Sequence, residues 1–216
     1  MADAGLVKRV KRKKLKKGKR GKAAKANVTF GAKRKDDKFE PIPKTALHSV
    51  ENEFLEACKD YLDYYPKDKE VPSVSFRSAE IFIKKGHYSE GIKRLEVIME
   101  HHAKHRFAGF AAATLFDANY RLRRWDQMER WGRYMLERRN FKVMKKKQLR
   151  DVIAISINEY ATELNAKGEK DKAAKEMLRF VKEFPKHEKA SIALFNAAAI
   201  NEQAERTEEA IDLYES

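Results

Sequence analysis

This sequence of 216 residues is poor in residues that cross-link a chain and in residues that interrupt helices. It has a single cysteine, Cys58, so no intrachain disulfide can form. Nine glycines and five prolines are few for this length, which favours helices over turn-rich β structure. No stretch approaches the roughly 18 apolar residues of a transmembrane helix, and no apolar segment follows the basic N-terminus as in a secretory signal. These absences predict a helical, cytoplasmic protein.

Positive charge, by contrast, is abundant and concentrated at the N-terminus. Residues 1–38 contain 16 Lys and Arg and 3 acidic residues, which gives +13 of the chain's net +15. Because like charges repel and the segment has little apolar surface to bury, we expect a disordered basic arm and linker over residues 1–46. The arm could bind the phosphates of nucleic acid or another polyanion, or an anionic membrane. It could instead act as a nuclear localisation signal, or serve only to keep the chain soluble. The polyanion-binding candidates in it are Lys11, Arg12, Lys13, Lys14, Lys16 and Lys17.

Residues 47–216 form a different region, in which an internal repeat is visible. Four segments align without gaps, beginning at Ala79, Phe116, Ala161 and Ala198. Equivalent positions are therefore 37, 45 and 37 residues apart. A period of this length is typical of stacked helical hairpins. The sequence thus predicts an all-α domain of about three and a half to four helix pairs.

The residue types at repeated positions have mechanical reasons. Gly86 and Gly168 stand where the first helix of a pair must end in a left-handed cap. Pro66 and Pro185 end second helices, so residues 50–65 are expected to form the second helix of an earlier half-repeat. Small residues stand where two helices of a pair are expected to cross closely, namely Ala79, Ala161 and Ala198 on first helices and Gly91, Ala173 and Ala210 on second helices.

This pattern resembles the tetratricopeptide repeat over residues 50–216. The best copy is formed by Tyr160, Ala161, Leu164, Gly168, Ala173, Met177, Phe180 and Pro185. The resemblance implies a right-handed solenoid of antiparallel helix pairs, and the Glu-Phe-Pro-Lys-His ending looks most like bacterial Tol-Pal accessory proteins and outer-membrane assembly lipoproteins. The second repeat departs from the family, with Arg123 at the turn glycine and Met128 and Gly132 at the usual alanine and aromatic. Eight extra residues then lengthen the first helix of the third repeat back through Lys145.

The same resemblance predicts the function. First helices of such solenoids line a concave surface that binds extended peptides, and this chain lacks the Lys and Asn set of the family's carboxylate clamp. Its rows of apolar and acidic residues suit an apolar-basic peptide. We therefore expect a non-catalytic protein–protein interaction scaffold in a bacterial multiprotein assembly, at the envelope or in the periplasm if the chain is a fragment. The groove candidates are Phe76, Glu80, Asp117, Tyr120, Asn158, Thr162 and Phe195.

An alternative function is a nucleic-acid-associated adaptor. Residues 121–150 contain 12 Lys and Arg and 3 acidic residues, so they form a basic flank beside several aromatic residues. The competing interpretation is that Trp125 belongs to the repeat core and that the arginines are a solvated face. Salt separates the two functions, because phosphate contacts weaken steeply with ionic strength and an apolar groove does not. The polyanion-binding candidates of the flank are Arg124, Arg130 and Arg133.

Other chemistry is weakly indicated. His101 and His105 lie one helical turn apart, but no third metal ligand accompanies them, so no metal site is predicted. Cys58 lies on an apolar stripe and is expected to be a buried thiol. No Ser/His/Asp set, glycine-rich phosphate loop or pair of carboxylates occurs at a recognisable spacing. The sequence therefore predicts neither an enzyme nor a cofactor.

Overall fold

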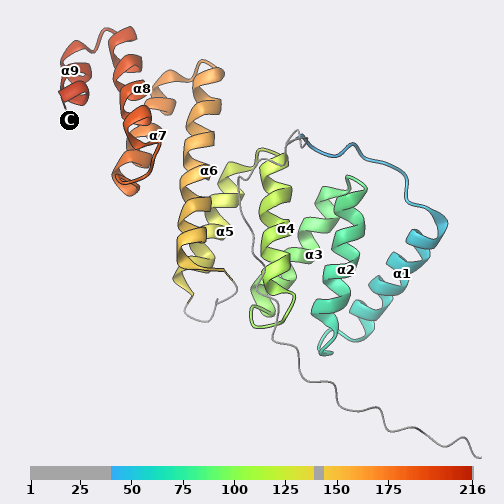
Figure 1. The fold of residues 1–216 in the computed structure, drawn as a ribbon. Coiled ribbons are helices and arrows are strands. Elements are labelled where there is room, and N and C mark those ends of the chain that lie inside the picture. Colours follow the sequence, from blue (N-terminus) through green and yellow to red (C-terminus); the bar gives the residue numbers. More distant parts are fainter. Residues whose placement is uncertain (1–39, 139–143, 216) are drawn as a thin grey trace, which may run out of the picture.

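A computed structural model of the chain describes residues 40–138 and 144–215. Within these two ranges the protein is all-α, as the sequence predicts, and no strand occurs there. The described residues form nine helices, which are labelled in Figure 1. They are α1 (Ser49–Tyr64), α2 (Val71–Lys84), α3 (Tyr88–His101), α4 (Ala108–Arg121), α5 (Trp125–Glu137), α6 (Lys146–Ala166), α7 (Lys170–Glu183), α8 (Ala190–Gln203) and α9 (Thr207–Glu215).

Each helix packs against the next one in the chain, so the helices form a row from α1 at one end to α9 at the other (Figure 1). We call α2, α4, α6 and α8 the first helices, and α3, α5, α7 and α9 the second helices of four pairs. The helix expected over residues 50–65 is α1, which precedes the first pair. The lengthened first helix of the third repeat is α6, whose 21 residues begin at Lys146.

The turn inside each pair has the same backbone geometry. In the residues that the structure describes, the positive φ angles are those of Gly86 (74°), Arg123 (53°), Gly168 (81°) and Glu205 (59°). These four positions are equivalent in the sequence repeat. In each turn the following backbone N–H donates to the carbonyl five residues earlier, as in a Schellman cap. The four bonds are His87 to Phe82 (2.8 Å), Arg124 to Asn119 (2.9 Å), Glu169 to Leu164 (2.9 Å) and Arg206 to Asn201 (3.0 Å).

Small residues lie where helices of a pair approach closely. Ala79, Ala161, Ala198, Ala173 and Ala210 are all buried, as expected for crossing points. The clearest case is Gly91 of α3, where an added Cβ would come within 2.7 Å of Ile83 Cδ1 and 3.2 Å of Ala79 O. Repeat-like packing of consecutive helices therefore follows from residues that the sequence repeat identifies.

The second pair differs from the others for a visible reason. At the position of Gly91, Ala173 and Ala210, α5 has the fully buried Met128, whose bulk keeps α5 farther from α4 than second helices lie from their partners elsewhere. The small residue of α5 is instead Gly132, which faces α6. A Cβ there would lie 2.8 Å from Ile153 Cγ1. The close approach thus moves from α4/α5 to α5/α6, where the lengthened helix packs.

Residues 40–47 form an extended segment along the turns of the first two pairs (Figure 1). The sequence assigned residues 40–46 to the arm and linker, but their contacts attach them to the helical body. Gly86 permits this, because an added Cβ would lie 2.5 Å from Ile42 O and 2.6 Å from Pro43 O. The hydrogen bonds of the segment are Ile42 N to Tyr88 Oη (2.9 Å), Thr45 N to Lys85 O (2.9 Å), His87 Nε2 to Thr45 O (2.8 Å) and Arg121 Nη1 to Glu40 O (3.3 Å).

Candidate functional site

The predicted groove residues lie on first helices, but they differ in how much surface they offer. Thr162 of α6 and Phe195 of α8 are exposed, and Phe195 shows 59% of its surface. Four other predicted groove residues are half-buried, namely Glu80 on α2, Asp117 and Tyr120 on α4, and Asn158 on α6. We call the surface formed by these residues and their repeat-equivalent neighbours the first-helix face.

Phe76 was predicted as a groove residue, and the structure places it in the core instead. Its side chain is only 7% exposed. The ring stacks on Phe107, with 5.1 Å between ring centroids, and lies 6.2 Å from the ring of Phe110. The reason is local: the segment before α4 brings Phe107 against α2 and covers Phe76. At the position of Phe76, aromatic packing therefore covers the first-helix face.

Two exposed apolar residues of the first-helix face were missed by the sequence analysis. Phe110 on α4 is 39% exposed and Ile192 on α8 is 60% exposed. The same repeat position holds Ile155 on α6, which is half-buried. The signal was present in the alignment, because these residues precede the row of Phe195 by one helical turn. Large apolar side chains at one repeated position, left in water, are what a binding surface for apolar segments requires.

The apolar surface continues onto α9. The ring of Phe195 lies 5.5 Å from that of Tyr214, centroid to centroid. Ile211 and Tyr214 of α9 are 49% and 45% exposed. Their equivalents on α7 are Ala174 and Met177, which are buried. The α8–α9 end of the row therefore exposes four large apolar side chains, those of Ile192, Phe195, Ile211 and Tyr214.

Acidic groups of this face are partly neutralised by neighbouring cations. Asp117 Oδ2 accepts a hydrogen bond from Arg121 Nε at 2.9 Å. Glu159 of α6 lies 3.6 Å from the Lys189 ammonium. Burial raises the pKa of Tyr120, and the nearby Glu159 carboxylate raises it further. The face is therefore less acidic than the sequence suggests, and its exposed apolar residues define its character.

Trp125 belongs to the core, which confirms the simpler interpretation of that residue. It is buried at the start of α5, and its ring packs edge-on against Tyr120 at 5.2 Å. Its Nε1 donates to Glu163 Oε2 at 2.7 Å. The Lys167 ammonium, with Trp125, lowers the pKa of Glu163. Trp131 is likewise buried, so neither indole is available to stack on a base.

The polyanion candidates of the basic flank have different environments. Arg133 is bound in an ion-pair network between α5 and α7, with Glu129 at 2.8 Å and Glu183 at 2.6 Å. Arg130 lies over the ring of Trp131, 5.3 Å from its centroid, and donates to Gln127. Arg124 is exposed and forms no ion pair with the acidic residues that the structure describes. The six arm candidates from Lys11 to Lys17 lie outside the described residues.

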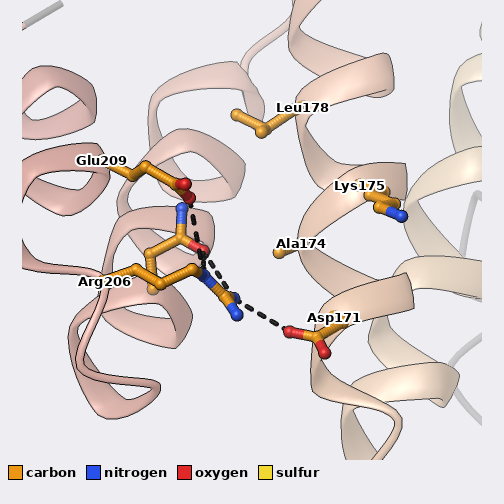
Figure 2. A pocket seen from close by; sticks show the side chains of 7 residues that line it. Asp171, Ala174, Lys175, Leu178, Arg206 and Glu209 are labelled. Atoms are coloured by element: carbon orange, nitrogen blue, oxygen red, sulfur yellow. Dashed lines mark hydrogen bonds and ion pairs between the residues drawn. The ribbon is translucent and has the colours of Figure 1, made fainter.

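A pocket of about 360 Å³ lies between α7, α8 and α9 (Figure 2). Its centre is the Arg206 guanidinium, which donates to Asn201 Oδ1 at 2.7 Å and to Asp171 Oδ1 at 2.9 Å. Glu209 lies 3.5 Å from Arg206 Nε. Because Arg206 is already neutralised by Asp171 and Glu209, we interpret this arrangement as an ion-pair contact that holds the α8–α9 pair against α7. The lining is completed by Ala174, Lys175 and Leu178.

The remaining reactive groups are isolated. In the described ranges, no group of three or more His, Cys, Asp and Glu is placed to hold a metal ion. Burial lowers the pKa of His105. Burial also raises the pKa of the Cys58 thiol, which is buried on α1 as the sequence predicts. No helix in the part of the chain that the structure describes is long and apolar enough to cross a membrane.

Comparison with known proteins adds no relative. No protein-family model, no curated protein and no solved structure matches this chain. The function is therefore inferred from the repeat, the first-helix face and the charge distribution.

Proposed function

We propose that this protein is a non-catalytic interaction scaffold that binds a segment of a partner protein on the first-helix face. In this proposal the helix pairs form a right-handed solenoid of tetratricopeptide type. The four turns, each with a positive φ angle at the equivalent residue, and the small residues at helix crossings support that assignment. A row of stacked pairs buries one continuous core and leaves a long face available to a partner.

The observation behind the proposal is the exposure of large apolar side chains at repeated positions. Phe110 and Ile192 are equivalent, and Phe195 lies one turn from Ile192. Exposed apolar side chains arranged in a row cost solvation free energy unless a partner covers them. Since Asp117 and Glu159 already have cationic neighbours, the partner segment is chiefly apolar, with basic residues as a secondary feature. By resemblance, its setting is a bacterial multiprotein assembly.

The test is a selection of peptides from a displayed random library on the full chain in 0.5 M KCl, where ionic contacts are screened. Selected peptides are then measured against Phe110→Ser and Ile192→Ser. The matched control is Val97→Ser, because Val97 is as exposed as Phe110 but lies on the second helix α3.

We expect each first-helix variant to weaken binding about tenfold or more, which corresponds to ~1.4 kcal/mol or more for a buried apolar anchor. Val97→Ser should bind like wild type. Ile192→Ser, at the most exposed of the three sites, should keep the thermal midpoint of wild type within about 2 °C, and circular dichroism should show all three variants folded at the temperature of the binding assay. Equal binding by Phe110→Ser, Ile192→Ser and wild type would place the contact elsewhere and refute the proposal.

A further inference from the structure

Five exposed cations flank residues 139–143, between α5 and α6. Arg138 directly follows the last residue of α5, and the other four begin α6. All five are exposed, and none forms an ion pair with an acidic residue in the described ranges. Glu137 and Asp151 are the acids nearest in sequence, so the junction keeps a net positive charge. We call Arg138, Lys145, Lys146, Lys147 and Arg150 the α5–α6 cation cluster.

Two of these cations, Lys146 and Lys147, lie where positive charge opposes helix stability. The N-terminus of a helix has a partial positive charge, which acidic residues in the first turn offset and basic residues oppose. Second helices α3, α5, α7 and α9 each have an acidic residue in the first turn, whereas the first helices α2, α4, α6 and α8 have none. Of these four first helices, α6 alone has cations in its first turn, Lys146 and Lys147. An arrangement that costs stability is expected where a surface serves binding.

We propose that the α5–α6 cation cluster binds the phosphate backbone of nucleic acid, independently of the proposed function of the first-helix face. The partner must be a dense polyanion, because several cations within one helical turn need closely spaced anions to neutralise them. Double-stranded nucleic acid presents a charge about every 1.7 Å along its axis. The basic N-terminal arm, with +13 over residues 1–38, adds attraction of the same sign.

The surroundings of the cluster favour nucleic acid over a membrane surface. In residues 111–138 and 144–159, no large apolar side chain is exposed, whereas insertion of an anchor into lipid needs exposed apolar side chains. Met144, next to Lys145, is buried. Tyr134 is half-buried with Arg138 placed over its ring, 4.0 Å from the centroid, so it is covered on that side. Because phosphate contacts carry no sequence information, binding through this cluster should be independent of sequence.

This assignment replaces the flank candidates Arg124, Arg130 and Arg133. Arg133 is held by Glu129 and Glu183. Arg124 precedes α5, and a helix of 13 residues is about 20 Å long, so it lies at the opposite end of α5 from the cluster. The basic flank of the sequence is therefore two separate surfaces in space.

The experiment uses the full chain and a fluorescein-labelled 20-base-pair duplex DNA in two unrelated sequences, followed by anisotropy from 50 to 200 mM KCl. The test variant is K146Q/K147Q/R150Q. The control is K93Q/K182Q/K186Q, which removes the same charge from exposed lysines without ion pairs in the described residues. Sedimentation with phosphatidylserine-containing vesicles runs in parallel.

We expect wild type to bind both duplexes equally, with affinity that falls steeply with salt. The test variant should bind at least about tenfold more weakly at 50 mM KCl, and its salt slope should be smaller by about 2–3, since each lost phosphate contact removes ~0.9 from the slope. The control should stay within about threefold of wild type. The thermal midpoint of the test variant should equal or exceed that of wild type, because unfavourable charges at the helix N-terminus are gone.

Three results would overturn the inference. Wild type that fails to bind DNA at 50 mM KCl shows that the cluster is not a phosphate contact. If the test and control variants bind DNA with equal affinity, binding depends on net charge or on the basic arm and not on the α5–α6 cation cluster. Vesicle binding that is lost only in the test variant, with unchanged DNA binding, makes the cluster a membrane contact instead.

Discussion

Replacing each of the two turn glycines by alanine distinguishes two contributions to stability: local backbone strain, and the attachment of residues 40–47 to the helical body. Gly86 and Gly168 have φ angles of 74° and 81°, so an alanine is strained similarly at either site. Their surroundings differ. A Cβ at Gly168 meets nothing within 4 Å, whereas a Cβ at Gly86 would lie 2.5 Å from Ile42 O and 2.6 Å from Pro43 O. Gly86→Ala must therefore displace residues 40–47.

The size of the difference follows from the contacts of that segment. Left-handed backbone costs an alanine roughly 1–2 kcal/mol, partly offset by the lower entropy of the unfolded chain. Gly168→Ala should thus lose ~1 kcal/mol of unfolding free energy. Gly86→Ala should lose the same amount and, in addition, the bonds of Ile42 and Thr45 to Tyr88, Lys85 and His87. At ~0.5–1.5 kcal/mol for each of these three bonds, the extra loss is about 2–4 kcal/mol.

The assay is thermal unfolding followed by circular dichroism at 222 nm. For a helical body of this size, 1 kcal/mol corresponds to a shift of about 2–4 °C. Gly168→Ala should lower the midpoint by about 2–4 °C, and Gly86→Ala by about 6–20 °C. In a chain that begins at Leu47, the two substitutions should have equal effects, because the displaced segment is already gone. Equal shifts in the full chain would show that residues 40–47 contribute nothing at this turn.

Further predictions concern the core, the ion pairs and the thiol. Ala173→Leu overpacks a fully buried crossing and should cost ~1–3 kcal/mol in urea unfolding, whereas the exposed Ala166→Leu should change the midpoint little; equal tolerance would refute the repeat register. Burial alone would raise the pKa of Glu129, but hydrogen bonds from Arg179 and Arg133 lower it overall. A carboxyl with a lowered pKa stabilises the fold above its unfolded value near 4.5 and loses that contribution as pH falls through the folded pKa. Glu129→Gln should therefore reduce the stability difference between pH 6 and pH 3, and an unchanged pH profile would contradict the network. Cys58 should react slowly with Ellman's reagent in the native chain and at the rate of a free thiol in urea; rapid native labelling would mean that α1 is not packed on α2.

Much of the fold could be predicted because its signals are local and repeated. Gly86 and Gly168 mark turns by their backbone preference, and the alignment extends the same turn to Arg123 and Glu205, which have no such preference. Alanines at fixed spacing mark helix crossings in the same way. The lengthened α6 follows from the eight additional residues before the third repeat.

The candidate surfaces were harder to predict, because exposure depends on residues distant in the sequence. Phe76 has the repeat position of a face residue, but Phe107 covers it from a neighbouring segment. Arg133 has the composition of a basic patch, but Glu183 reaches it from α7, fifty residues later. The composition of residues 40–46 predicts a linker, but these residues pack against the turn at Gly86, where the absence of a Cβ leaves room for Ile42 and Pro43. In each case the deciding partner comes from another element.

The most direct test of the scaffold is photo-crosslinking of a peptide selected in 0.5 M KCl. A photoreactive amino acid replaces Asn196, which is exposed on α8, follows Phe195 and lies one helical turn after Ile192, or Lys182, which is exposed on the second helix α7. The proposal predicts adducts from position 196 in high salt, their loss in an Ile192→Ser background, and none from position 182. Adducts from position 182 alone, or adducts from 196 that vanish at 0.5 M KCl, would contradict binding on the first-helix face.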